Sequence, residues 1–326
     1  MKKQMINNLK VGDEVETQAV ILELNRVAFT SAQRSGEYFL KLTLGDVSGR
    51  VKAVMWDPPV GDEAVAAGDV VFLRGSVNEY HGLQVVVSDL RRLDKTKVNK
   101  AFFQPVSERD SDEMVAELQT IIKEEIEDKN LKALLETFFG GAEFLRRFSQ
   151  APAARTIHHN CVGGLLEHTL EVVSLCRGLT DLYQGRINRD LLLTGAILHD
   201  IGKLEEYNQD SISFEFSDRG KLVGHISIGK EMLDQKLSGL PDFPAELKLE
   251  LEHMMLTHHG QRDWGSPEVP KTINAFALFH ADLVSARMNQ FLGIMKNHPE
   301  GSGDWTEWDR FLERSVYTGN TKNENE

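Results

Sequence analysis

Cysteine is scarce in this chain, and long apolar runs are missing. Only two cysteines, Cys161 and Cys176, occur among 326 residues. They are too few for a disulfide framework or a zinc knuckle, which favours a reducing cytoplasm. No apolar run approaches the ~18 residues of a membrane span, so we expect no membrane partner. The start, MKKQMINNLK, has lysines but no apolar segment behind them, so we expect no secretory signal peptide.

An excess of basic residues is also missing. The net charge of −13 argues against a protein that coats nucleic acid non-specifically. The charge is uneven, because residues 1–100 hold 14 Lys+Arg and 13 Asp+Glu, whereas the remainder holds 23 and 37. An acidic segment can still bind a polyanion where metal ions or a local basic groove supply positive charge.

The length allows two domains joined by a helical spacer. We predict a multidomain α and β protein, in which a small five-stranded OB-type β-barrel is followed by an all-α domain. The expected segments are the barrel at 1–95, a helical connector at 96–150, the all-α domain at 151–316 and a polar tail at 317–326.

Five strand-like runs support the barrel. They are EVETQAVILEL, EYFLKLTL, RVKAVMW, DVVFLRGSVNEY and LQVVVSDL. Turn residues separate them, with a longer insertion between the third and fourth runs. This spacing is typical of an OB-type barrel, and an SH3-like barrel is the alternative.

The alternation within these runs predicts a binding face. If Leu40, Leu42 and Leu44 point into the core, their neighbours point outward. The predicted outward set is Phe39, Lys41, Arg50, Lys52, Val54, Trp56, Phe72 and Arg74. Aromatic rings interleaved with basic residues suit single-stranded nucleic acid, because bases stack on rings while cations follow the phosphates. The alternative is a solvated face with a few stray aromatics.

The next segment reads as helical. Met114, Leu118, Ile122 and Ile126 recur at helical spacing, and Ser111 is the expected N-cap. Shorter helices are expected at 131–139 and 142–149, and the chain beyond them to about residue 316 also reads as helical. The tail TGNTKNENE is polar, and we expect it to fray.

Ten of the eleven histidines lie between residues 158 and 298. His168 falls on the apolar face of one predicted helix. His199 and Asp200 end a second apolar helix, and Asp282 lies in a third. Any one of them alone is most often a core residue with its own hydrogen-bond partner. Together they point to one divalent ion, which would remove the burial penalty of all four. Imidazole and carboxylate donors suit Mn, Fe, Co, Ni or Zn.

The order H…HD…D, with LHDIGK at 198–203, resembles the HD-domain metal-dependent phosphohydrolases. Further motifs resemble the YhaM-type 3'-5' exoribonucleases, which carry an OB domain followed by an HD domain. These motifs are RTIHHNCVGGLLEHTL at 155–170, GHISIG around His225, THHG at 257–260, WGSP at 264–267 and HADLVSAR at 280–287. The resemblance covers nearly the whole chain in the same order.

The resemblance implies roles for individual residues. The first-metal ligands are His168, His199, Asp200 and Asp282, and a second metal adds His225 and His258, with Asp200 bridging. Adjacent helical residues point about 100° apart, so His259 is expected to be either a ligand, a support for one or a substrate contact. Lys203 matches a lysine near the phosphate, where its charge would stabilise the transition state; a helix C-terminal lysine is the alternative. His159, with His158, matches a histidine pair whose expected role is substrate contact or general acid.

The function implied is a metal-dependent phosphodiesterase that removes 5'-nucleotides from the 3' end of single-stranded RNA. One or two divalent ions, Mn²⁺ first among them, would activate water and clamp the phosphate. WGSPEVP replaces the Gly-Tyr-Pro of HD-GYP cyclic dinucleotide phosphodiesterases, and Gly164 replaces their metal-binding glutamate. The alternatives are hydrolysis of a small nucleotide and a non-catalytic RNA-binding regulator. RNA and single-stranded DNA stay open as substrates, and so do monomer and homo-oligomer.

Overall fold

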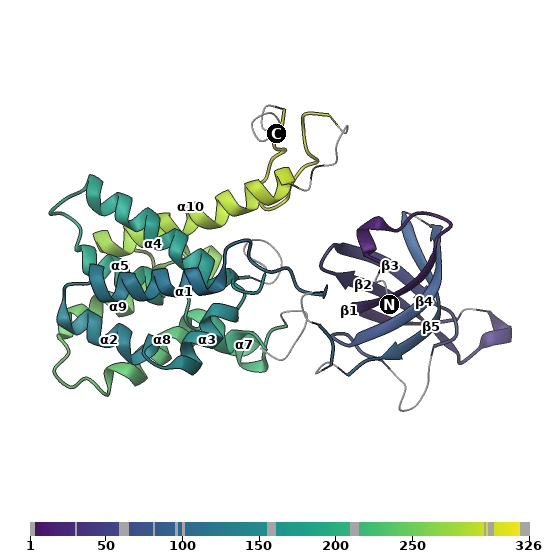
Figure 1. Cartoon of the computed structure of the whole chain (residues 1–326), viewed down its shortest axis with the longest axis horizontal. Helices are drawn as coiled ribbons and strands as arrows, with labels where there is room; N and C mark the ends of the chain where they lie inside the picture. Colours follow the sequence, from purple (N-terminus) through teal and green to yellow (C-terminus); the bar gives the residue numbers. More distant parts are fainter. Residues whose placement is uncertain are drawn as a thin grey trace. The chain divides into compact units, whose positions relative to one another are not determined.

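The computed structural model describes residues 4–29, 31–58, 65–80, 82–94, 97–99, 102–154, 161–208, 215–296, 298 and 303–319. The chain forms two compact units. The first comprises Met1–Val106 and Asn208–Glu215, and the second comprises Ser107–Tyr207 and Phe216–Glu326. Figure 1 shows one unit of strands and one of helices.

The first unit is a closed five-stranded barrel. Its strands are β1 (Glu14–Ala28), β2 (Tyr38–Asp46), β3 (Gly49–Met55), β4 (Val70–Glu79) and β5 (Leu83–Arg92). They close in the order β1-β2-β3-β5-β4, and the only parallel pair among these strands is β3 with β5. The order and the closure confirm the predicted OB-type barrel. Short 3₁₀ turns, η1 (Ile6–Asn8) and η2 (Ala32–Arg34), flank the first strand.

The barrel interior follows the predicted alternation with one exception. Leu40, Leu42 and Leu44 are buried in its core, as expected. Val54 was expected on the outside, but its side chain is buried as well. Its cross-strand partners are Lys41 on β2 and Val86 on β5, so it has a neighbouring residue on each side. Alternation along one strand does not show such neighbours.

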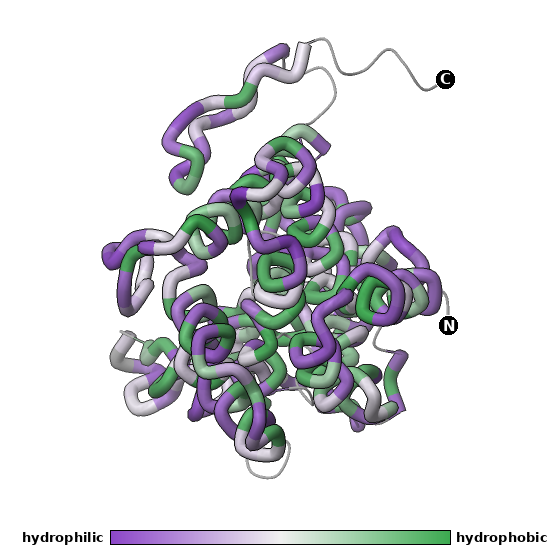
Figure 2. The backbone as a smooth tube through the Cα atoms, turned by 90° about the vertical axis from the view of Figure 1, so that its left-hand side faces the viewer, coloured by the Kyte–Doolittle hydropathy of each residue, from purple (hydrophilic) through white to green (hydrophobic). Residues whose placement is uncertain are grey.

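The second unit is helical. Its first part contains α1 (Ser111–Thr120), the π-helical turn η5 (Ile121–Glu125), α2 (Lys129–Phe139) and α3 (Ala142–Gln150). The second part contains α4 (Gly164–Leu182), α5 (Arg189–Leu198), α6 (Lys203–Glu206), α7 (Asp218–Val223), α8 (His225–Leu237), α9 (Ala245–Thr257), η6 (Arg262–Trp264) and α10 (Ile273–Lys296). Hydrophobic and hydrophilic residues alternate along these helices (Figure 2), as helices with one buried face require.

The segment expected as a connector is part of the helical unit from residue 107 onward. Leu118 of α1 and Phe138 of α2 belong to the same hydrophobic core as Leu166 of α4 and Leu193 of α5. Their apolar faces need burial, and the neighbouring helices supply it. The N-cap of α1 is Asp110, one residue before the predicted Ser111, because its carboxylate accepts from the backbone amides of residues 112 and 113.

The end of the chain differs from the prediction. Residues 303–319, which we call the C-terminal hairpin, contain no helix; Trp305 bridges Tyr317, and Asp309 bridges Arg314. The Asp309 carboxylate accepts from two backbone amides just after it, which favours a turn over a helix. The expected tail therefore starts later than 317, because the Thr318 amide donates to the Asp304 carbonyl at 2.7 Å.

None of the helices in the described part of the chain has the length and the uninterrupted apolar character that a membrane crossing needs.

Candidate metal centre

One helix interior and one helix end bring the first donors together. His168 lies in the second turn of α4, on its apolar face, and is buried as predicted. The α5 helix ends at Leu198, and His199 and Asp200 follow at its end. Potential ligand atoms of His168, His199 and Asp200 all lie within 4.8 Å of one another. We call these three residues the first donor group.

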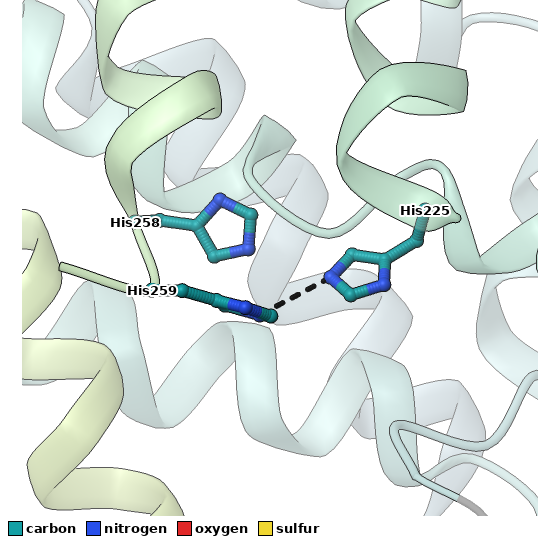
Figure 3. A group of neighbouring side chains, drawn as sticks. All are labelled: His225, His258 and His259. Atoms are coloured by element: carbon teal, nitrogen blue, oxygen red, sulfur yellow. Dashed lines mark hydrogen bonds between the residues drawn. The ribbon is translucent and has the colours of Figure 1, made fainter. Parts of the chain in front are cut away.

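A second group of three histidines comes from two other helix ends. His225 starts α8, while His258 and His259 follow the end of α9. Their rings converge (Figure 3), and the two Nε2 atoms of His225 and His259 are 3.3 Å apart. All three offer ligand atoms within 4.8 Å of one another, and we call them the second donor group.

The place of His259 shows why two adjacent histidines can face the same space. The 100° rule for adjacent residues holds only inside a helix. Here α9 ends at Thr257, so His258 is its C-cap and His259 already lies in the turn that follows. The chain direction changes between them, and both rings face the same space.

Asp200 lies between the two groups. Its Oδ2 atom is 3.3 Å from His199 Nε2 and 3.7 Å from His168 Nε2. Its Oδ1 atom is 3.6 Å from His225 Nε2 and 3.7 Å from His258 Nε2. Each carboxylate oxygen therefore faces one group.

Asp282 on α10 completes the first group. Its Oδ1 atom is 3.1 Å from His168 Nε2 and 4.0 Å from His199 Nε2. The structure thus brings together all six predicted metal ligands, together with His259.

All five rings turn the same nitrogen inward. Each Nδ1 atom has a partner away from the centre. These partners are the Ser285 hydroxyl for His168, the Ala196 carbonyl for His199, the Glu206 carboxylate for His225, the Met255 carbonyl for His258 and the Trp264 carbonyl for His259. Carbonyls and carboxylates only accept, so Nδ1 must donate. The Ser285 hydroxyl donates a hydrogen bond to the Glu171 carboxylate at 2.6 Å, so it accepts one from His168.

In a neutral ring that donates from Nδ1, the Nε2 atom carries a lone pair. The Nε2 atoms of His168 and His199 nevertheless face each other at 3.3 Å. Among the described residues, His258 Nε2 and Asp200 Oδ1 are buried without a hydrogen-bond partner. A cation at the centre is the partner that so many converging lone pairs need.

Burial changes the pKa values of the rings in the cluster. Burial lowers the pKa of His168 despite the nearby Asp282, and it holds the pKa of His258 well below the usual value. Burial also lowers the pKa of His259, with His225 adding to the effect. Burial acts against a proton on His199 too, but the charge and hydrogen bond of Asp200, together with the charge of Asp282 and the Ala196 carbonyl, outweigh it and raise that pKa. Burial therefore favours the neutral form of His168, His258 and His259, the form that binds a metal ion.

Lys203 supports Asp200. Its ammonium donates to Asp200 Oδ2 at 2.6 Å, and both side chains are buried. Burial would raise the pKa of Asp200, but the charges of Lys203 and His199 hold it well below the ordinary value. Asp200 is therefore ionised and ready to bind a cation.

The comparisons with known proteins agree with this geometry. Residues 165–287 match the family model described as HD domain. The 3'-5' exoribonuclease YhaM of Listeria welshimeri is 31% identical to this chain over 304 residues, which cover 92% of this chain and 94% of that protein. The YhaM of Bacillus subtilis is 33% identical over 283 residues, which cover 86% of this chain and 87% of that protein.

This chain belongs to the YhaM family of 3'-5' exoribonucleases. Among solved structures, it is similar to the second OB-fold domain of replication protein A from Methanococcus maripaludis. The identity is 19% and the TM-score 0.25, and the similarity covers 28% of this chain and 95% of that domain.

In this YhaM-family chain, the HD match contains both donor groups and Asp282. It also contains three residues that the sequence did not single out, namely Glu171, Ser285 and Glu206. Glu206 accepts from both the backbone amide and the ring of His225. Ser285 lies in the motif HADLVSAR, three residues after Asp282, and that spacing was the available signal.

Other histidines are placed elsewhere. His159 and His158, predicted from the YhaM-type motif, lie outside the described residues. His253 Nε2 accepts from the Lys271 amide, and the exposed His280 ring packs on Phe276 and Phe279.

The predicted nucleic-acid residues form two surfaces instead of one. Phe39 and Trp56 are 4.8 Å apart between ring centroids, and each contacts Phe29, which the sequence analysis missed. We call these three rings the barrel patch. Lys41 and Lys52 are exposed on the same two strands.

Phe72 and Arg74 lie far along the barrel from this patch. Phe72 pairs with Gln18 of β1, whereas Phe39 pairs with Val27. These nine residues correspond to about 30 Å of strand. Arg74 also forms an ion pair with Glu16 at 2.9 Å. Apart from Val54, the described strands follow the predicted alternation, but alternation within a strand does not give the register between strands.

Proposed function

We propose that this protein is a metal-dependent 3'-5' exoribonuclease that releases 5'-nucleotides from single-stranded RNA. The observation that carries the proposal is the convergence of two donor groups on the two oxygens of Asp200. Membership of the YhaM family supplies the direction and the substrate.

Two divalent ions fit the donors. The first would be held by His168, His199, Asp200 and Asp282, and the second by His225, His258, His259 and the other oxygen of Asp200. Ions bound there would polarise the phosphate and supply an activated water. Mn²⁺ is our first choice, and Fe, Co, Ni and Zn also suit these donors.

The protein's own residues position the reacting groups. Lys203 keeps Asp200 oriented and puts a positive charge beside the place where phosphate charge develops. The partners of the Nδ1 atoms hold the rings so that no donor needs to rotate on binding.

The barrel patch would hold the RNA strand by stacking, with Lys41 and Lys52 near the phosphates. This division of labour fits the uneven charge of the chain. We place the activity in the cytoplasm, because the thiols of Cys161 and Cys176 are free.

The test is a denaturing gel with 5'-labelled RNA and DNA oligomers and Mn²⁺. We expect a descending one-nucleotide ladder on RNA, complete loss with EDTA, and recovery on adding Mn²⁺ back. Asp200→Asn should abolish the ladder because it removes the charge shared by both groups, while the circular dichroism spectrum should not change. A ladder from metal-free protein would contradict the proposal, and the DNA lanes settle substrate preference.

A further inference from the structure

A cavity of about 660 Å³ opens over the metal centre. Its floor includes Asp200, Lys203 and Asp282, and aromatic residues line its walls. Tyr207 and Phe216 form one of these aromatic pairs, with ring centroids 5.1 Å apart. We call this space the catalytic cavity.

One wall comes from the C-terminal hairpin. Phe311 lines the catalytic cavity, as do Arg287 and Gln290 of α10. Arg287 Nη1 donates to the Phe311 carbonyl at 2.8 Å, and Gln290 Nε2 donates to Asp309 Oδ1 at 3.1 Å. These two bonds fasten the hairpin to the helix that carries Asp282.

The hairpin lies outside the residues that match the HD family model. The HD match ends at residue 287, so Gln290 and Phe311 are outside it. The hairpin nevertheless has a defined structure. The Leu312 side chain is buried, and the Thr306 amide donates a hydrogen bond to the Val316 carbonyl across the hairpin. An HD site is therefore extended here by a segment with its own structure.

We propose that the C-terminal hairpin forms the wall of the pocket for the 3'-terminal nucleotide, and that Phe311 contacts its base. The inference rests on the proposed function. Gln290 lies eight positions after Asp282 on α10, a rise of about 12 Å. This length is comparable with one nucleotide from its phosphate to the far edge of its base.

The chemistry of Phe311 fits a base. Phe311 lines the cavity and is 41% exposed, with the Arg310 guanidinium carbon 4.5 Å from its ring centroid, so a base would share the ring with that cation. A ring stacks on any of the four bases, and an enzyme that shortens RNA one nucleotide at a time needs this tolerance. Arg287 is a positioning residue here, because it holds the Phe311 backbone.

The test compares Phe311→Ala with Trp308→Ala. Trp308 is 68% exposed on the same hairpin and does not line the cavity, so it is a matched control. The substrates are a 5'-labelled RNA and the same RNA with an abasic ribose at its 3' end. For Phe311→Ala we expect KM to rise about tenfold on the ordinary RNA, as for loss of one base–aromatic stack, with kcat little changed. On the abasic RNA its KM should equal that of the wild type.

Two further variants guard against a structural effect. Phe311→Tyr keeps the ring and should retain the wild-type KM, whereas Phe311→Leu keeps bulk without a ring and should behave like Phe311→Ala. Equal KM values for Phe311→Ala and wild type on ordinary RNA would overturn the inference, as would an equal loss on both RNAs. If the wild type leaves RNA intact, the proposed function fails instead, so the two failures are distinct.

Discussion

At the residue scale, the site depends on side chains that never touch the centre. The Ser285 hydroxyl accepts a hydrogen bond from His168 Nδ1 at 3.0 Å and donates one to the Glu171 carboxylate. This chain fixes the tautomer of His168, so that the Nε2 lone pair points to the first donor group. Loss of such an outer partner commonly weakens metal binding without removing a ligand.

Ser285→Ala should therefore lower the affinity for the first metal about 10–100-fold. Titration of metal-stripped protein with Mn²⁺ in a calorimeter measures this. Ser238→Ala, an exposed serine after α8, is the control and should bind as the wild type does. Unchanged affinity in Ser285→Ala would mean that packing alone orients His168.

The two cysteines allow a second prediction at this scale. Burial raises the pKa of Cys176 to about 12, and burial with the charge of Glu167 does the same for Cys161. A thiol with this pKa is protonated at pH 8, and only the thiolate is an effective nucleophile. Mass spectrometry should show slow iodoacetamide labelling of the folded protein at pH 8 and fast labelling in urea. Equal rates would contradict the assigned shifts.

The sequence predicted which residues converge better than it predicted which residues support them. The predicted ligands His168, His199 and Asp282 each lie in a sequence motif, and the structure brings them together. Glu206 is one of several glutamates near the motif, and only the approach of α6 to α8 selects it. That approach is a tertiary contact with no periodic signal in the chain.

At the element scale, the close contact between Gly202 and α8 shapes the site. A Cβ atom on Gly202 would lie 2.0 Å from the His225 carbonyl oxygen and 2.6 Å from the Gly229 amide nitrogen. Both are backbone atoms, which cannot rotate away. The glycine of the LHDIGK motif thus sets the distance between Asp200 and His225.

Gly202→Ala should lower the free energy of unfolding by about 1–3 kcal/mol, because backbone must shift to admit the methyl group. Gly178→Ala is the matched control, since a Cβ there meets nothing within 4 Å. Gly178 is inside α4, so alanine should stabilise by about 0.5–1 kcal/mol. Urea denaturation measures both changes. A neutral Gly202→Ala would show that α8 can move freely.

Elements were predictable where a period repeats. The five strands and the helices α4 and α5 follow their apolar patterns closely. The C-terminal hairpin has no such pattern, and its turn depends on one carboxylate, Asp309, that bonds nearby amides. Local side-chain hydrogen bonds of this kind can override helix propensity, and they leave no periodic pattern in the sequence.

At the scale of the whole molecule, charge and aromatic surface divide between two units. Residues 1–100, which contain the barrel strands, are close to neutral in net charge, and the remainder carries the acidic excess. A catalytic unit of this sign repels RNA until metal ions are bound. The barrel patch should therefore matter most for substrates long enough to reach it.

The double variant Phe39→Ala/Trp56→Ala should raise KM about tenfold on a 20-nucleotide RNA and leave a dinucleotide unaffected. Tyr80→Ala, an exposed aromatic just after β4, is the control and should change neither. Steady-state kinetics on both substrates measures the difference. If length makes no difference in the wild type, the enzyme is a hydrolase of small nucleotides.

The inward-facing rings have one more consequence. Their Nδ1 partners are protein atoms, so the hydrogen bonds that orient the rings do not depend on an ion. The empty scaffold should keep its shape, so one divalent ion can be exchanged for another without refolding. The metal that this protein carries in a cell is then decided by supply, through the relative abundance of divalent ions during its lifetime.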